Sequence, residues 1–458
     1  MNDLPSLQDL ATRFRDGQTT VRAVVELAIA NHQAGGLGAY KTWNGADAAK
    51  TAAHVDGLIA AGYDAGPLMG MPCSVKDLYG VPGLPVFAGT DAAFDPDWQR
   101  AGPVMAGLLD QLGVVMGKTH TVEMAFGGLG TNPHWGPPRN PWGDGGRVPG
   151  GSSSGAGVSL LEGSAVLAFG TDTAGSVRIP ASVTGNVGLK ITHGRWSLDG
   201  IVPLSPSFDT PGILCRTVED IRYAFNALDP LRPAIAGVAE LSGLGIGVLE
   251  GIAAEGVDDD IAAAITGTLG TLETRGARLR PATLSRSDAA IALLRKGGLA
   301  APELAGFMQE FLPERIARLD PTVRARIDGA KDLSAADYIR RKFTFADMAA
   351  RTAASDFAGH DILACATVAI SPPELSALTT PDGYAAANLA VLRNPAIVNL
   401  LGLCAITLPV GLDRNGMPIG MMLIAPPMQE ERLITAALAI ERAIGTGAAL
   451  LGRPPLTA

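Results

Sequence analysis

Residues 150–180 read GGSSSGAGVSLLEGSAVLAFGTDTAGSVRIP, and this stretch decides the fold of the chain. Two clusters rich in serine and glycine, 150–155 and 170–176, flank an apolar run. Glycine lets backbone N–H groups turn toward a ligand in conformations that are closed to other residues. A serine hydroxyl is a nucleophile only when a base removes its proton. The stretch therefore raises the question of which residue supplies the base.

Composition indicates a globular protein that is large enough for one big domain or two. Of the 458 residues, 47% are hydrophobic and 18% are charged, which excludes a disordered chain. The mean hydropathy is +0.22, yet no apolar run reaches the roughly 18 to 20 residues of a membrane span. The first 17 residues lack a basic leader followed by an apolar stretch, so we expect no signal peptide and a cytoplasmic protein.

Charge and ligand-type residues argue against nucleic acid and metal. The net charge is −9 and no Lys/Arg-rich patch stands out, so nucleic-acid binding is a poor expectation. The four cysteines are scattered and form no CxxC pair (Cys73, Cys215, Cys365 and Cys404). We expect buried free thiols in a reducing compartment. The six histidines show no ligand spacing, and we predict neither a metal nor another cofactor.

Three lysines are candidates for the base. Lys76 directly follows the predicted strand 69–75, Lys118 lies in VVMGKTH, and Lys190 lies in GLKITHG. Burial at the end of an apolar strand disfavours the ammonium form and lowers the pKa of a lysine. For Lys76 the ordinary alternative is a snorkelling side chain or an ion pair with Asp77. Spacing alone does not choose among the three.

The segment from Ala125 to Gly151 is rich in Gly, Pro, Asn and Trp, which predicts an irregular loop. Long loops of this kind inside compact domains are usually functional. We expect it to wall a pocket, with Phe126, Trp135 and Trp142 supplying apolar surface. The equally weighted alternative is that these aromatic rings only pin the loop to the core.

The turn that follows the predicted helix 155–162 and strand 165–169 is the second candidate feature. Residues 170–176 project several consecutive N–H groups, and such a nest suits an oxyanion. Taken alone, this segment could be an ordinary glycine-rich turn, and the three serines at 152–154 could be a solvated linker.

Together these motifs resemble the amidase signature family. Ser152 and Ser176 lie at the family's separation, and the likeness covers most of the chain, with the middle least clear. The matching segments are Lys76, 150–155, 170–180, 188–190, 194–195, 202–203 and 209–212, then Asn399, 409–411 and 416–420, which resemble the family's C-terminal strands.

The resemblance implies an α/β fold, in which a central mixed twisted sheet is covered by helices on both faces. We expect a single domain over residues 1–458, with a signature core at 70–215 and a helical lid at 285–354. Elsewhere, periodicity predicts strands at 114–117, 245–250, 362–367, 405–412 and 419–425, and helices at 20–32, 46–61, 103–112, 258–275 and 430–443.

The resemblance also implies roles for the polar residues. Ser176 would be the nucleophile, Ser152 a bridging serine that follows a cis peptide bond, and Lys76 the base, which leaves Lys118 and Lys190 as scaffold. Ser-Lys arrangements are known variants of the catalytic triad. The oxyanion would be held by the backbone N–H groups of Thr173, Ala174, Gly175 and Ser176.

Neighbouring residues are assigned in the same way. We expect substrate contacts from Ala125, Phe126, Gly128 and Ser153, and we expect Asp172 and Arg178 to fix the turn. The chain departs from the family at Ala174, where a second glycine is usual, at Met422 instead of glutamine, and at Leu403 instead of proline. Alanine does not take positive φ cheaply, so the turn must use a conformation that alanine permits or shift its donors slightly.

These roles imply a hydrolase that cleaves a carbonyl C–N bond through an acyl-serine intermediate. The substrate would be a small apolar or aryl amide, with carbamates (urethanes) and esters left open. The alternative is the glutaminase component of a transfer-RNA-dependent amidotransferase, which would need partner proteins. We disfavour it because the residues after Lys118 do not resemble that subfamily. A homodimer is left open, and we expect neither a nucleic-acid nor a membrane partner.

Overall fold

The computed structural model describes residues 4–231, 234–235 and 240–457. Its strands are β1 (Tyr40–Trp43), β2 (Pro72–Lys76), β3 (Val114–Thr119), β4 (Leu167–Asp172), β5 (Val187–Lys190), β6 (Thr210–Cys215), β7 (Gly245–Leu249), β8 (Arg278–Ala282), β9 (Ile362–Ala366), β10 (Cys404–Leu412) and β11 (Pro418–Ala425). Its α-helices are α1 (Leu7–Arg15), α2 (Val21–Gly35), α3 (Gly45–Ala60), α4 (Pro103–Leu109), α5 (Ser154–Glu162), α6 (Arg178–Thr184), α7 (Val218–Leu228), α8 (Asp259–Thr274), α9 (Ser287–Arg295), α10 (Ala300–Phe311), α11 (Pro321–Asp328), α12 (Ala335–Ser355), α13 (Pro381–Leu400), α14 (Glu430–Ile444) and α15 (Gly447–Leu451).

All of the described strands join one mixed sheet, as expected. Its order is β1-β3-β2-β4-β6-β5-β10-β11-β9-β7-β8. Strand β2 pairs in parallel with β3 and β4, and β7 pairs in parallel with β8 and β9, while the strands between them run antiparallel. The carboxyl ends of β2 and β4 therefore meet at one edge, and Lys76 and Asp172 occupy those ends.

Helices cover both faces of this sheet, as side-chain alternation requires. On β4 and β6, Ala168 and Leu214 pack in a cluster with residues of α5 and α6. Their neighbours Phe169 and Ile213 point the other way and join the large core cluster that includes α7 and α14. The signature stretch is thus buried between the sheet and the rest of the protein, with α5 and α6 built from its own residues.

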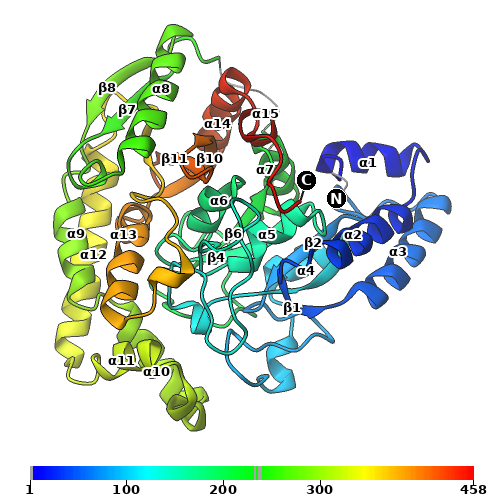
Figure 1. Ribbon diagram of the computed structural model, residues 1–458, viewed down its shortest axis with the longest axis horizontal. Helices are drawn as coiled ribbons and strands as arrows, with labels where there is room; N and C mark the ends of the chain where they lie inside the picture. The colour runs from blue at the N-terminus through cyan, green and yellow to red at the C-terminus, as the bar shows by residue number, and fades with distance from the viewer. Residues whose placement is uncertain (1–3, 232–233, 236–239, 458) are drawn as a thin grey trace.

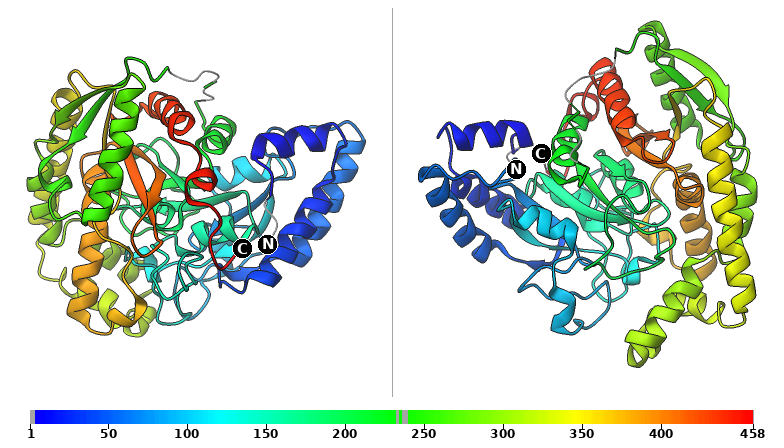
Figure 2. Two further views of the ribbon diagram at one scale, coloured as in Figure 1. Left: turned by 45° about the horizontal axis from the view of Figure 1, so that its top comes forward. Right: turned by 180° about the vertical axis from the view of Figure 1, so that it is seen from behind.

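Helices α9 to α12 occupy the segment that we expected to be helical, and they lie at one side of the molecule (Figure 1). Helix α12 runs beside α13, and α10 and α11 continue below them; the rear view shows the same arrangement (Figure 2). We refer to residues 285–354 as the lid segment. That it acts as a lid stays a prediction.

The predicted elements agree with the structure to within a few residues, with one misplaced motif. The sequence pattern groups Asn399 with C-terminal strands, but this residue lies in the last turn of α13. The apolar pattern predicts no membrane span, and one described segment, Glu430–Leu451, is long and apolar enough to cross one. Half of its apolar window is buried inside the protein, so it is weak evidence for a span.

Candidate active site

Lys76 is the last residue of β2, and its side chain points at a serine. Its Nζ lies 2.8 Å from Ser152 Oγ and 2.8 Å from Thr171 Oγ1. The lysine is fully buried. Burial lowers the pKa of Lys76 to about 7, although the charges of Asp209 and Asp172 act in the opposite direction. A lysine with these neighbours is half neutral near pH 7 and lies within reach of a hydroxyl proton.

The two rival lysines have other partners. Lys118 Nζ forms a fully buried ion pair with Asp77, 3.0 Å from its Oδ1. Lys190 Nζ donates to the carbonyl oxygens of Ile191 and Leu403, each at 2.8 Å. Burial lowers the pKa of Lys190 to about 8, so the pKa by itself does not distinguish it from Lys76. Contact with a serine hydroxyl does distinguish Lys76 from Lys190. The ion pair with Asp77, which was the alternative expected for Lys76, is formed by Lys118 instead.

Ser152 is held by its backbone. The Gly151–Ser152 peptide bond is cis, as the resemblance implied. The Ser152 carbonyl accepts from Thr121 Oγ1 at 2.9 Å and from the Val122 N–H at 3.2 Å. These bonds fix a serine that is fully buried.

Ser176 lies on the cavity side of this pair. The N–H of Ser153 donates to the Ser176 carbonyl at 3.2 Å, which brings the two serine-bearing segments together. Ser176 and its neighbours Thr173 and Ala174 line a cavity of about 750 Å³. Ser176 therefore lines the cavity, whereas Ser152 and Lys76 are fully buried and do not line it.

The turn before Ser176 is organised by one carboxylate. Asp172 accepts from the N–H groups of Gly175, at 2.7 Å, and Val177, at 3.2 Å. Gly175 has φ +122°, and a Cβ there would lie 2.5 Å from Pro395 Cβ, so glycine is required. Ala174 is not among the described residues with positive φ, so the turn uses a conformation that alanine permits.

One of the four expected oxyanion donors needs correction. The Gly175 N–H already has an acceptor in Asp172, and that bond draws it away from a substrate oxygen. Within the described residues the N–H groups of Thr173, Ala174 and Ser176 have no acceptor at hydrogen-bond distance. Three of the four expected backbone N–H groups, those of Thr173, Ala174 and Ser176, are therefore left as candidate oxyanion donors.

Asp172 is itself held by a buried pair, which fits the expectation that it and Arg178 fix the turn. Arg178 donates from Nε and Nη2 to the two carboxylate oxygens at 3.0 and 2.9 Å, and Asn399 donates to Asp172 at 2.9 Å. Burial alone would raise the pKa of Asp172, but the Arg178 charge and hydrogen bonds hold it well below its usual value. Arg178 Nη1 also lies 3.0 Å from Met422 Sδ, so the side chain at this departure from the family contacts a residue that holds the turn.

A second buried carboxylate supports the other end of the turn. Asp209 accepts from Thr173 Oγ1 at 2.5 Å and from the N–H groups of Leu204 and Ser205, each at 2.9 Å. Burial raises the pKa of Asp209 to about 6. Its charge is the largest favourable electrostatic influence on the ammonium form of Lys76. The sequence places this aspartate in a matching motif but assigns it no role.

The expected substrate contacts divide into two groups. Ala125 and Phe126 line the cavity. Gly128 and Ser153 do not: the Gly128 N–H donates to Asn388 Oδ1 at 2.7 Å, and Ser153 Oγ donates to the Thr171 carbonyl at 3.3 Å. Both are buried supports of the site, and Asn388, which sequence did not single out, lines the cavity itself.

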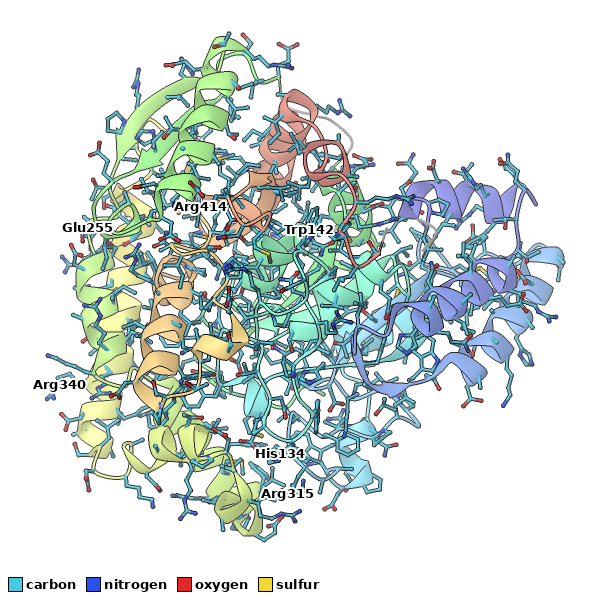
Figure 3. All side chains as sticks on the ribbon, in the orientation of Figure 1. His134, Trp142, Glu255, Arg315, Arg340 and Arg414 are labelled. Atoms are coloured by element: carbon cyan, nitrogen blue, oxygen red, sulfur yellow. The ribbon has the colours of Figure 1, made fainter. Side chains whose placement is uncertain are left out.

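The aromatic rings of the long loop also divide. Phe126 walls the cavity, as expected. Trp142 is buried and its indole N–H donates to the Thr184 carbonyl at 3.0 Å, and Trp135 donates to the Thr90 carbonyl at 3.1 Å. Trp142 lies in the interior beside α15, away from the lid segment (Figure 3). These two rings pin the loop to the core.

The lid segment supplies much of the cavity wall, and it brings charge. Its apolar wall residues include Leu294 and Ala301, while Leu204, Leu389 and Leu392 add apolar surface from outside the segment. Basic ones are Arg295, Lys296, Arg326 and Arg341, and the acidic one is Asp332. These cations escape prediction from sequence because the lid segment is charge-rich throughout, and no spacing separates inward from outward residues.

Ligand-type side chains do not gather elsewhere. In residues 4–231, 234–235 and 240–457, no three His, Cys, Asp or Glu side chains form a cluster of the kind that holds a metal ion. All four cysteines are free and buried, as predicted.

Comparison with known proteins identifies relatives that align with nearly the whole chain. The chain is 52% identical over 456 residues to a 2-amino-5-chloromuconic acid deaminase of Comamonas testosteroni, covering 98% of each chain. It is 30% identical to one of the subunits of glutamyl-tRNA(Gln) amidotransferase of Geobacter sp. (strain M21), covering 89% of this chain and 90% of the relative. A crystal structure of an amidase superposes with a TM-score of 0.87 at 27% identity, over 96% of this chain and 100% of that one.

A family model described as Amidase matches residues 23–434, nearly the whole chain. The chain therefore belongs to the amidase signature family and is an enzyme of the amidase class, a C–N hydrolase.

Proposed function

We propose that this enzyme cleaves the C–N bond of a small molecule through Ser176 as nucleophile, Ser152 as bridge and Lys76 as base. Neutral Lys76 accepts the proton of Ser152 while Ser152 accepts that of Ser176, and Ser176 Oγ bonds to the carbonyl carbon. The proton on Lys76 then returns through the relay to the departing nitrogen as the C–N bond breaks. Water attacks the acyl-serine by the same relay, releasing a carboxylic acid and restoring the Ser176 hydroxyl.

The contact of 2.8 Å between Lys76 Nζ and Ser152 Oγ supports this proposal most strongly, because that lysine is buried and has a lowered pKa. The developing oxyanion would be stabilised by the N–H groups of Thr173, Ala174 and Ser176. Losing one such donor typically slows a reaction by about 100- to 1,000-fold.

The candidate substrates are small amides, carbamates and esters. The relative at 52% identity bears the name of a deaminase of a chlorinated muconic acid, so 2-aminomuconate is tested beside this panel. Its amino group is bonded to an alkene carbon, so its release as ammonia would need a step other than acyl transfer to Ser176. The lid segment would select among them, because it builds the far wall of the cavity. The glutaminase alternative is weaker: the relative named as part of an amidotransferase is only 30% identical.

The test measures the leaving group that the full chain releases, which is an amine or ammonia from the nitrogen compounds and an alcohol from the ester. One acyl group is presented as primary amide, p-nitroanilide, carbamate and ester, together with glutamine and 2-aminomuconate. We expect release from at least one of the amides or the carbamate, and loss of that release in Ser176→Ala with an unchanged thermal unfolding midpoint. Equal rates in the wild type and Ser176→Ala would contradict the mechanism. Turnover of glutamine alone would favour the amidotransferase alternative.

A further inference from the structure

Four cations of the lid segment face the same cavity as Ser176. They are Arg295 and Lys296 at the end of α9, Arg326 on α11 and Arg341 on α12. Asp332 is the one acidic residue of the described lining, so the wall carries an excess of three positive charges. Among the described residues, none of the four has a carboxylate oxygen within 4.0 Å. A cavity wall of this kind attracts anions.

Two of these cations have another explanation. Arg295 and Lys296 stand at the C-terminus of α9, where a positive charge is favoured by the helix dipole. Both are largely exposed to solvent. The inference therefore depends on Arg326 and Arg341, which are partly buried. Arg341 lies inside α12, and Arg326, although it lies in the last turn of α11, is held by a contact with the cavity wall.

Arg326 is fixed over the cavity by a wall residue of the site. Its Nη1 donates to the Phe126 carbonyl at 2.7 Å, and its guanidinium carbon lies 4.7 Å from the centre of the Phe126 ring. Burial lowers the pKa of Arg326, although the charges of Tyr384 and Asp320 act in the opposite direction. Burying a guanidinium without a direct carboxylate partner is unfavourable, and an incoming carboxylate would offset this.

Arg341 is held in the same way, and its neighbour on α12 provides a contrast. Arg341 Nη1 donates to the Gly298 carbonyl at 2.9 Å, which leaves the rest of its fork toward the cavity that it lines. Arg340, one residue earlier, forms an ion pair with Asp337 and lies at the outer edge of the molecule (Figure 3). On α11, Arg324 is likewise paired outside the cavity, with Asp328 at 3.6 Å. On both helices the outward arginine has a carboxylate and the inward one has none.

We infer that the substrate of this enzyme carries a carboxylate, and that Arg326 and Arg341 bind it. The planar guanidinium fork matches a carboxylate in a bidentate geometry that lysine does not offer. The apolar part of such a substrate would contact Phe126, Leu389 and Leu392, with its C–N bond at Ser176. This inference rests on the proposed function, and it replaces the expectation of an uncharged apolar or aryl substrate.

The test measures binding, so that it does not need turnover. Three six-carbon dienes are titrated by calorimetry into Ser176→Ala: cis,cis-muconate with two carboxylates, sorbate with one, and 2,4-hexadien-1-ol with none. Each is repeated with Arg326→Gln or Arg341→Gln added, and with the matched controls Arg324→Gln and Arg340→Gln. Circular dichroism and the thermal midpoint establish that each variant is folded, and Arg326→Lys tests whether charge alone restores binding.

We expect muconate and sorbate to bind and hexadienol to bind at least tenfold more weakly. A charged hydrogen bond contributes enough for each inward substitution to weaken anion binding about 10- to 100-fold. The outward controls should change it less than twofold, and Arg326→Lys should restore only part of it. Equal affinity for the acids and the alcohol, or equal effects of inward and outward substitutions, would overturn the inference. Anion binding as expected, in a wild type that hydrolyses nothing, would overturn the proposed function and leave the carboxylate site standing.

Discussion

The pH dependence of the reaction follows from the buried state of Lys76. Burial lowers the pKa of Lys76 from 10.5 to about 7, and the proposed relay needs its neutral form. The neutral fraction falls tenfold for each pH unit below the pKa, so it is about a tenth at pH 6 and about nine-tenths at pH 8. We therefore expect kcat/KM to rise about tenfold between these values and to level off above pH 8.

The assay follows amine release under kcat/KM conditions from pH 5 to 10 in buffers of constant ionic strength. The variant Asp209→Asn makes the assay more specific, because the Asp209 charge raises the pKa of Lys76 and the variant removes that charge. The amide of asparagine can still form hydrogen bonds with Thr173 and the backbone. The midpoint should move to lower pH in this variant and stay unchanged in the surface control Asp47→Asn. A flat profile, or a rate that still climbs above pH 9 as an ordinary lysine would give, would refute the reasoning.

The remaining predictions concern stability. Lys76→Met should abolish turnover and raise the free energy of unfolding by about 1 to 3 kcal/mol at pH 6, with a smaller increase at pH 9. The reason is that folding lowers the pKa of Lys76 from 10.5 to about 7, so the buried ammonium destabilises the folded state fully below about pH 7 and progressively less toward pH 10.5. Asp172→Asn breaks the buried pair with Arg178 and should cost about 3 to 5 kcal/mol in urea unfolding; a cost under 1 would contradict the pairing. Gly155→Ala puts a Cβ 2.0 Å from the Ala39 carbonyl oxygen and should lower the free energy of urea unfolding by about 1 to 3 kcal/mol; an unchanged value would contradict the close packing of the two segments. Trp142→Phe loses one buried hydrogen bond and should lower the free energy of unfolding by about 1 to 2 kcal/mol with kcat/KM unchanged. A changed kcat/KM would contradict the assignment of Trp142 to the core and favour a place in the cavity wall.

Much of the fold could be predicted because strong local patterns dominate it. The sequence pattern alone predicts long apolar strands such as β10 and β11. It also predicts amphipathic helices that begin at a capping residue, such as Ser6 or Ser334. Helix α13 did not, since it has Pro395 inside it and apolar residues on every side of its last turns. Short strands such as β5 are defined by their partners in the sheet, which no local window contains.

The residues of the candidate site also differ in how far the sequence predicts them. The serine clusters and Lys76 could be predicted, because their residue types and separation are specific. Contacts from far along the chain could not: Asn388 meets Gly128 across 260 positions, and Arg326 meets Phe126 across 200. The Gly175 donor was misjudged because only the folded turn shows that Asp172 already accepts from it.

The most direct measurement is the chemical trapping of the nucleophile. The full chain is treated with an excess of a fluorophosphonate, and the modified residue is identified by peptide mass mapping. We predict one adduct, on Ser176, that forms in the wild type and forms at least tenfold more slowly in Ser152→Ala and in Lys76→Met. An adduct on Ser152 or Ser153, or a Ser176 adduct that forms at the same rate without Lys76, would contradict the relay.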